Sequence, residues 1–293
     1  MSSRIIHSDC EKLLTAKALR EAGFSEEIDL TFLDPPFNQD KYYISHDDNM
    51  PEKDYWEWMG RVSERICQLT APGGAIYFMQ REKNTEHVLR CLGSSGWAFQ
   101  NLIIWKKMTS AIPCQTRFGK QYQIIAFATK GKRPKLFNKL RIDPPLPASY
   151  KCKRDNGIYV TDVWNDIREL TSGYFAGEEP LRGAEGERFH KQQSPIQLLL
   201  RIILSSSNPG DLVLDPFAGT GTTSVVAEQL GRNSISIESS IRNVGAIEDR
   251  LSAQREADDI SRYYEYYRYT PDLEKLWPRR KFTAAKVEKG EEI

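Results

Sequence analysis

The sequence predicts an α/β domain built on a largely parallel β-sheet. Short apolar stretches that suit buried strands alternate with longer stretches that have the apolar spacing of helices. Glycine and proline turns separate many of these stretches, which favours repeated strand–helix units over an all-helical or all-β fold. The predicted strands cover residues 4–7, 28–33, 75–79, 97–105, 121–128, 212–214 and 234–237.

The predicted helices cover residues 10–22, 51–69 and 222–230, a stretch that starts near 241, and the apolar stretch IQLLLRIILSS. Ser194 and Pro195 precede that apolar stretch, and we expect them to be its N-cap and first helical residue. The helix should end near Pro209. Residues 257–293 are charged and contain the aromatic run YYEYYRY, which predicts a C-terminal helix followed by a charged tail.

Composition narrows the classes of protein that the chain can represent. Its 293 residues are 40% hydrophobic and 28% charged, which is typical of a globular domain in water. No apolar run approaches the roughly 20 residues that span a bilayer, and the N-terminus lacks a secretory signal, so we expect a cytoplasmic protein and no membrane partner. The five cysteines contain no CxxC pair and the four histidines do not cluster, so neither a metal site nor a disulfide framework is expected.

Charge is unevenly distributed, although the net charge is only +1. Thirteen lysines or arginines and one acidic residue, Asp143, lie between Lys106 and Arg154. This segment therefore carries +12 and the rest of the chain −11. Such a basic segment favours a surface that binds a polyanion such as nucleic acid, because lysine and arginine neutralise phosphates. A solvated basic face without a partner is the alternative.

The stretch VLDPFAGTGTT, residues 213–223, predicts a ligand site. A strand ends at Asp215, Gly219 and Gly221 allow a tight turn that approaches a ligand closely, and a helix follows. Glu238 ends the next strand, where a carboxylate can accept hydrogen bonds from two ribose hydroxyls. The absence of a lysine after Gly221 argues strongly against a P-loop, and a dinucleotide site is weakened because a third glycine is missing in register. We therefore expect a nucleoside ligand rather than a tight turn alone.

A second motif, Asp34-Pro35-Pro36-Phe37, follows the predicted strand at 28–33. The two prolines stiffen the chain and have no N–H, so their carbonyls are free to accept next to a carboxylate. An exocyclic amine has two N–H donors, which Asp34 and the Pro35 carbonyl can bind while they orient the nitrogen lone pair. Phe37 can stack on a base that has left the duplex. The alternative is a proline-rich strand exit with a capping aspartate.

The two motifs together resemble the amino-methylating DNA methyltransferases, and their order is similar to the permuted beta group of that family. The similarity covers residues 1–250 apart from the middle. It implies a Rossmann-like, mostly parallel seven-stranded methyltransferase sheet with an inserted target-recognition region. It also implies direct methyl transfer from S-adenosyl-L-methionine to the exocyclic N6 of a flipped-out adenine in double-stranded DNA.

Several alternatives stay open within this resemblance. Asp34 at the first motif position is similar to the adenine enzymes, but Phe37 is less usual there than tyrosine, so an N4-cytosine enzyme is the alternative. An inactive DNA-binding protein with the same fold is more distant, and a small-molecule oxidoreductase is an outsider. Pro113-Cys114-Gln115 resembles the nucleophile motif of cytosine-C5 methyltransferases, but it precedes the glycine loop and no ENV follows it, so a catalytic cysteine is not expected.

The resemblance assigns roles to individual residues. The catalytic residues would be Asp34, Pro35, Pro36 and Phe37. Asp215 would lie near the methionine moiety, Glu238 would bind the ribose, and Asp9 would reach the adenine. The whole cofactor-binding set would be Asp9, Cys10, Asp34, Asp215, Pro216, Phe217, Ala218, Gly219, Thr220, Gly221, Thr222 and Glu238. The chain departs from the family pattern TQKP, because Ser194 replaces the lysine.

The resemblance also divides the chain. Residues 1–106 would form the catalytic part, 107–190 the target-recognition region, 191–256 the cofactor-binding part and 257–293 the C-terminal helix and tail, with strand 121–128 belonging to the core sheet. Four basic residues of the recognition region would contact DNA phosphates, namely Lys130, Lys132, Arg133 and Lys135. A cognate restriction endonuclease and a second copy of the chain are further partners that the resemblance leaves open.

Overall fold

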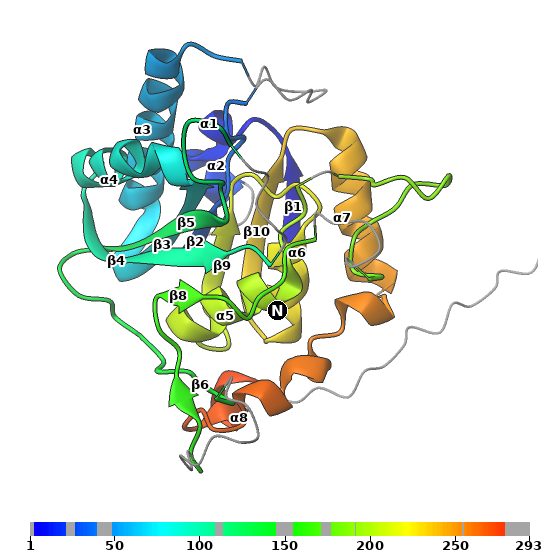
Figure 1. Ribbon diagram of the computed structural model, residues 1–293. Coiled ribbons are helices and arrows are strands. Elements are labelled where there is room, and N and C mark those ends of the chain that lie inside the picture. The colour runs from blue at the N-terminus through cyan, green and yellow to red at the C-terminus, as the bar shows by residue number, and fades with distance from the viewer. Residues whose placement is uncertain are drawn as a thin grey trace, which may run out of the picture.

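A single twisted sheet organises the computed structural model, which describes residues 3–21, 27–39, 49–108, 114–144, 155–170, 177–190, 192–253 and 255–278. The order of its eight strands is β1-β10-β9-β2-β3-β5-β4-β8 (Figure 1). The strands are β1 (Ser3–His7), β2 (Ile28–Leu33), β3 (Thr70–Arg81), β4 (Trp97–Lys106), β5 (Tyr122–Lys130), β8 (Val163–Trp164), β9 (Leu212–Asp215) and β10 (Asn233–Glu238). All seven predicted strands and the largely parallel α/β class are confirmed. The eighth strand, β8, comes from the region between the two motifs.

The direction of β5 decides where the loops open. Every sheet strand except β5 runs the same way, and β5 pairs antiparallel with both β3 and β4. The carboxyl ends of β2, β9 and β10 therefore lie at the same edge of the sheet as the end of β4 and the beginning of β5. The end of β5, at Lys130, lies at the opposite edge.

Helices cover both faces of the sheet. One face packs against α1 (Cys10–Leu13), α2 (Ala16–Glu21), α3 (Glu52–Leu69) and α4 (Thr85–Ser94), and the other against α5 (Ile196–Ser206) and α6 (Thr222–Gln229) (Figure 1). α5 is buried almost throughout, so its apolar residues form the centre of the hydrophobic core on the face that α5 and α6 cover, which we call the second core. α7 (Ile241–Ala253) contacts β1 and β10. None of the helices among these described residues is long and apolar enough to cross a bilayer.

Two helix predictions need correction. The helix predicted at 10–22 is two short helices, α1 and α2, with Leu14 and Thr15 between them, and its predicted end at Gly23 lies outside the described residues. The N-cap of α5 is Pro195 rather than Ser194. The Glu179 carboxylate accepts a hydrogen bond from the Ile196 N–H at 2.6 Å, so a side chain from another segment satisfies this helix start.

The C-terminal region is less helical than the sequence predicts. Three single 3₁₀ turns, Glu256–Asp258, Ser261–Tyr263 and Glu265–Tyr267, precede the short helix α8 (Leu273–Leu276). The aromatic run lies in these turns, and Tyr267 is buried in the second core. The predicted tail beyond Pro278 lies outside the described residues. A small two-stranded sheet, β6 (Arg141–Ile142) with β7 (Ile158–Tyr159), lies in the region between the motifs.

Candidate active site

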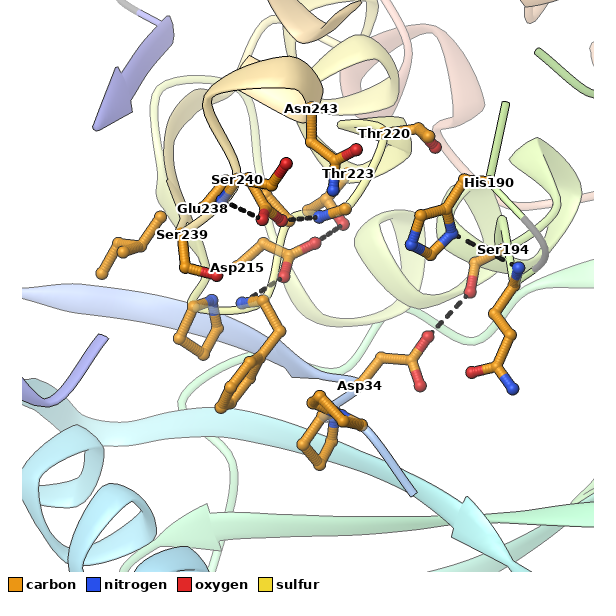
Figure 2. A pocket seen from close by; sticks show the side chains of 18 of the residues that line it. Asp34, His190, Ser194, Asp215, Thr220, Thr223, Glu238, Ser239, Ser240 and Asn243 are labelled. Atoms are coloured by element: carbon orange, nitrogen blue, oxygen red, sulfur yellow. Dashed lines mark hydrogen bonds between the residues drawn. The ribbon is translucent and has the colours of Figure 1, made fainter. Parts of the chain in front are cut away.

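A cavity of about 420 Å³ opens at the carboxyl edge of β2, β9 and β10 (Figure 2). The strand that follows β9 in sequence, β10, lies on one side of the neighbouring strands β9 and β2, and the strand that follows β2, β3, lies on the other side. Clefts at such switch points are where α/β sheets bind ligands. The cavity brings together the two motifs, which are about 180 residues apart in sequence. Of the predicted catalytic and cofactor-binding residues, all but Phe37 and Gly221 line it, namely Asp9, Cys10, Asp34, Pro35, Pro36, Asp215, Pro216, Phe217, Ala218, Gly219, Thr220, Thr222 and Glu238.

The glycine loop between β9 and α6 forms the floor of the cavity. The Asp215 carboxylate ends β9 and accepts hydrogen bonds from the Phe217 N–H at 3.1 Å and the Thr223 hydroxyl at 2.5 Å. Gly219 has a positive φ of 54°, and a side chain there would meet no atom closer than 3.8 Å, so its backbone faces open space. Its N–H donates to Glu238 at 2.8 Å, which ties the loop to the end of β10 (Figure 2).

Gly221 has a structural role that the motif alone does not reveal. It is the N-cap of α6 with a φ of 75°, a region that L side chains rarely adopt. A Cβ at this position would also lie 2.6 Å from the side chain of Ile247 on α7. Gly221 therefore allows α6 and α7 to approach each other, and it does not line the cavity.

Two buried carboxylates give the cavity its electrostatic character. Burial and, to a smaller extent, the nearby Glu238 carboxylate raise the pKa of Asp215 to about 7. Burial also raises the pKa of Glu238, whose oxygens accept hydrogen bonds from the backbone N–H groups of Ser240 and Gly219. Both groups would be stabilised as anions by a ligand that carries positive charge or several hydrogen-bond donors.

The exit of β2 is held rigidly on several sides. The Tyr55 hydroxyl on α3 donates to the Pro36 carbonyl at 2.7 Å, and the buried Gln80 amide donates to that hydroxyl at 2.9 Å. The Asn38 side chain pairs with both the N–H and the carbonyl of Met50. These contacts come from residues far along the chain, and no local motif predicts them.

Asp34 lies where the two halves of the cavity meet. Its Oδ2 accepts a hydrogen bond from the Ser194 hydroxyl at 3.1 Å (Figure 2). Ser194 therefore contacts the predicted catalytic carboxylate instead of capping α5. Lys107 also interacts with the Asp34 carboxylate, and its Nζ lies 3.1 Å from the centre of the Trp105 ring. Burial lowers the pKa of Lys107 to about 7, although the Glu169 and Asp34 carboxylates oppose this shift.

Phe37 does not line the cavity, and its predicted stacking role stays a prediction. Its side chain is 4% exposed and belongs to the core cluster beneath the cavity, with Trp105 and Trp164. Other aromatic residues line the cavity, and sequence reasoning missed them. Trp58 packs edge-on against Phe217, with ring centres 5.6 Å apart.

Residues 188–190 and 192–194 also line the cavity, on both sides of the predicted boundary between the recognition region and the cofactor-binding part. Phe189 lies against the Arg242 guanidinium of α7 at 4.3 Å, and both line the cavity. Gln193 is buried, and its amide binds the Leu181 N–H and the Glu179 carbonyl. These contacts fix the segment that presents Ser194 to the motif aspartate.

The four residues predicted to contact phosphates lie at the edge of the sheet opposite to the cavity. Lys130 donates to the carbonyls of Gln68 and Thr70 at the end of α3, and Lys135 pairs with Asp29. Lys132 and Arg133 are exposed on the turn after β5. The four residues lie there because β5 runs antiparallel and carries the residues after it away from the carboxyl edge, and their contact with phosphates stays a prediction.

Comparison with known proteins identifies the class. The profile of a family described as DNA methylase, of the N6/N4 type, matches residues 28–249, and the chain belongs to this family. The predicted family resemblance is therefore confirmed.

Individual relatives agree with this assignment. The chain is 31% identical to the type II methyltransferase M.BamHI of Bacillus amyloliquefaciens over 87% of its own length, and it spans 58% of that protein. It is 29% identical to the DNA adenine methyltransferase YhdJ of Escherichia coli (strain K12), covering 73% of this chain and 72% of that one.

Solved structures share the fold. The complex of M1.HpyAVI with S-adenosylmethionine aligns with a TM-score of 0.56 at 24% identity, over 86% of this chain and 99% of that one. The cytosine-N4-specific PvuII DNA methyltransferase aligns with a TM-score of 0.60 at 19% identity, over 90% and 92%. The fold is therefore shared with a cytosine-N4 enzyme, whereas the sequence relative YhdJ is named an adenine methyltransferase, so these comparisons do not discriminate between the two target bases.

Proposed function

We propose that this chain transfers a methyl group from S-adenosyl-L-methionine to the exocyclic N6 of an adenine extruded from duplex DNA. One observation carries the proposal. Asp34 and Pro35, an acceptor pair suited to an amine, line the same cavity as Asp215 and Glu238, which suit a cationic nucleoside. The membership of the chain in a DNA methylase family supports the assignment.

The cavity fits the proposed cofactor. Its volume of about 420 Å³ lies within the usual range for small-molecule sites. Glu238 is oriented by two backbone N–H groups at the end of β10, where ribose hydroxyls can reach its remaining lone pairs. The open space at Gly219 admits a ligand close to the backbone, and the raised pKa of Asp215 favours a positively charged group beside it. When bound, S-adenosylmethionine supplies an electrophilic methyl group on a positively charged sulfur.

The protein's own groups then position the target amine. Asp34 and the Pro35 carbonyl accept its two N–H bonds, so the nitrogen lone pair points away from them and toward the cofactor half of the cavity. Ser194 holds one oxygen of the Asp34 carboxylate, and Tyr55 holds the carbonyl of Pro36, the residue after Pro35. The carboxylate also stabilises positive charge that develops on the nitrogen during transfer. No covalent enzyme intermediate is required.

The choice of adenine rests on the aspartate at position 34 and on the resemblance to adenine enzymes. Incubation with genomic DNA and labelled S-adenosylmethionine, followed by nucleoside mass spectrometry and sequence mapping, tests it directly. We expect N6-methyladenine. N4-methylcytosine as the product would overturn the choice of base, and the absence of any methylated product would contradict the enzymatic function.

Two variants test the role of the carboxylate. Asp34→Ala should abolish transfer while the dissociation constant for S-adenosylmethionine, measured by calorimetry, changes by less than about tenfold, because other groups hold most of the cofactor. Ser194→Ala removes only one hydrogen bond from that carboxylate, so it should lower kcat by about tenfold, the equivalent of roughly 1.4 kcal/mol. Near-normal turnover by Asp34→Ala would rule out the proposed role.

A further inference from the structure

The connection between β4 and β5 is a basic loop that rises from the same edge of the sheet as the cavity. Lys106 pairs with Tyr122 at its base, and the Lys107 N–H donates to the Gln121 carbonyl at 2.7 Å. Arg81, at the end of β3, pairs with Gln123, near the start of β5, and β3 pairs in turn with β2. The edge that carries this loop therefore continues through β3 to the end of β2. The described part of this loop, residues 107–108 and 114–121, therefore stands beside the cavity rather than at the far edge.

The loop combines positive charge with an unusually exposed ring. Residues 106–121 contain Lys106, Lys107, Arg117 and Lys120 and no acidic residue. Phe118 is 98% exposed, whereas the other large hydrophobic side chains that are exposed in the described chain range from 40% to 66%. A phenylalanine ring that contacts almost nothing in its own protein is stabilised only when another apolar surface covers it.

The chemistry of the cavity indicates which apolar surface would cover the Phe118 ring. A base can reach Asp34 only after it has left the duplex, and its departure leaves a gap in the stack of bases. Apolar side chains inserted into duplex DNA regain stacking contact with the neighbouring bases. Flanking lysine and arginine side chains bind the phosphates on either side of such a gap. The loop presents both features together, at the edge where the base must enter.

We propose that Phe118 inserts into duplex DNA at the position vacated by the target base, while Arg117 and Lys120 bind the adjacent phosphates. The partner is a base-paired duplex, and the proposal rests on the proposed base-methylating function. Gly119 follows the ring and adds no side chain, which lets the loop backbone approach the DNA closely. In the absence of DNA, Lys120 pairs with Glu82 at 2.9 Å and this pair positions the loop at the carboxyl edge of β3; a phosphate would replace Glu82 as its partner.

The opposite edge of the sheet provides a matched control. Phe99 is also an exposed ring, at 51%, and it lies near the start of β4, at the edge where β5 ends. Lys132 and Arg133 are exposed basic residues on the turn at that same edge. The proposal therefore predicts that equal substitutions at the two edges have different effects on DNA and similar effects on stability.

Base extrusion by the full-length protein tests the ring. The probe is a duplex that contains the methylated sequence, with 2-aminopurine at the target position. Wild-type protein should raise the 2-aminopurine fluorescence. With Phe118→Ala this increase should be at least fivefold smaller, and with Phe99→Ala it should equal that of the wild type. Phe118→Trp should retain most of the signal because it restores a stacking ring. Thermal unfolding and cofactor binding should be the same for all four proteins.

A second duplex makes the test specific to insertion. When the target base is mispaired, extrusion needs less energy, so Phe118→Ala should recover most of its transfer rate on that duplex. Wild-type-like fluorescence and transfer by Phe118→Ala on the paired duplex would overturn the insertion proposal. A wild-type protein that methylates no duplex would instead overturn the proposed function, so the two failures are distinguishable.

Salt dependence of duplex binding tests the two basic residues. The double variant Arg117→Gln with Lys120→Gln should lower the slope of log K against log salt by about 2, because each lost phosphate contact removes roughly one released counterion. The control double variant Lys132→Gln with Arg133→Gln should leave that slope unchanged. An equal loss of slope in both double variants would contradict the assignment of the DNA-facing edge.

Discussion

The buried Asp215 carboxylate should make the cofactor-free protein less stable as pH rises. Burial and the neighbouring Glu238 raise its pKa from 3.8 to about 7, so the folded state binds this proton more tightly than the unfolded chain does. The stabilisation is complete below about pH 4 and is lost as pH rises through 7. A change from 3.8 to about 7 corresponds to about 4 kcal/mol of unfolding free energy.

The variant Asp215→Asn keeps the shape of the side chain and removes the charge. It weakens the hydrogen bonds from the Phe217 N–H and the Thr223 hydroxyl, at roughly 1 kcal/mol each. We therefore expect Asp215→Asn to be more stable than the wild type by about 2 kcal/mol at pH 8.5, and less stable by about 2 kcal/mol at pH 4. The same change should weaken S-adenosylmethionine binding, because the carboxylate favours its positive charge.

Urea unfolding of the cofactor-free proteins between pH 4 and 9, followed by circular dichroism, measures this difference. Asp258→Asn is the matched control with the opposite sign. Two arginines, Arg250 and Arg255, overcome the effect of burial and lower the pKa of Asp258, so its stabilisation is present above pH 4 and lost at lower pH. Asp258→Asn should therefore destabilise by about 3 kcal/mol at pH 7. A difference between Asp215→Asn and wild type that does not vary with pH would refute the reasoning.

Two further variants test how the cavity is held. Tyr55→Phe removes the hydrogen bond to the Pro36 carbonyl, and we expect kcat to fall about tenfold with little change in KM, as measured by steady-state transfer. Gly221→Ala places a Cβ 2.6 Å from Ile247 at a positive φ, and the midpoint of urea unfolding should show a loss of about 2–4 kcal/mol. A wild-type midpoint for Gly221→Ala would show that α7 can move aside freely.

Strands were the most predictable elements because each is an apolar run bounded by turn residues. Their limits were less predictable. β3 begins at Thr70 rather than at residue 75. The Pro72-Gly73-Gly74 sequence has the composition of a turn, which is why the strand was predicted to begin after it. In the structure these residues stay in the sheet through a bulge opposite Ile28 and Leu30. The helix α4 carries no strong start signal, and the sequence analysis did not predict it.

The predicted site residues lie together where a motif sits directly at the end of a strand, as Asp34, Asp215 and Glu238 do. Groups that support them come from elsewhere in the chain, and Tyr55 and Trp58 look like ordinary apolar positions of a helix. The position of the lysines after β5, at the edge opposite to the cavity, was not predictable for a different reason. Parallel and antiparallel strands have the same alternation of side chains, so the sequence does not encode which edge a strand reaches.

The antiparallel β5 also separates two sites for protein engineering. Its nine residues span about 30 Å, and the turn that follows them contains Gly131, where an added side chain would meet no neighbouring atom within 4 Å. A second domain inserted at this turn would project from the edge away from the cavity, whereas an insertion between Lys106 and Tyr122 would obstruct the approach of the duplex. The turn at Gly131 is therefore the place to attach a programmable DNA-binding module that would bring the proposed methylating site to a chosen locus.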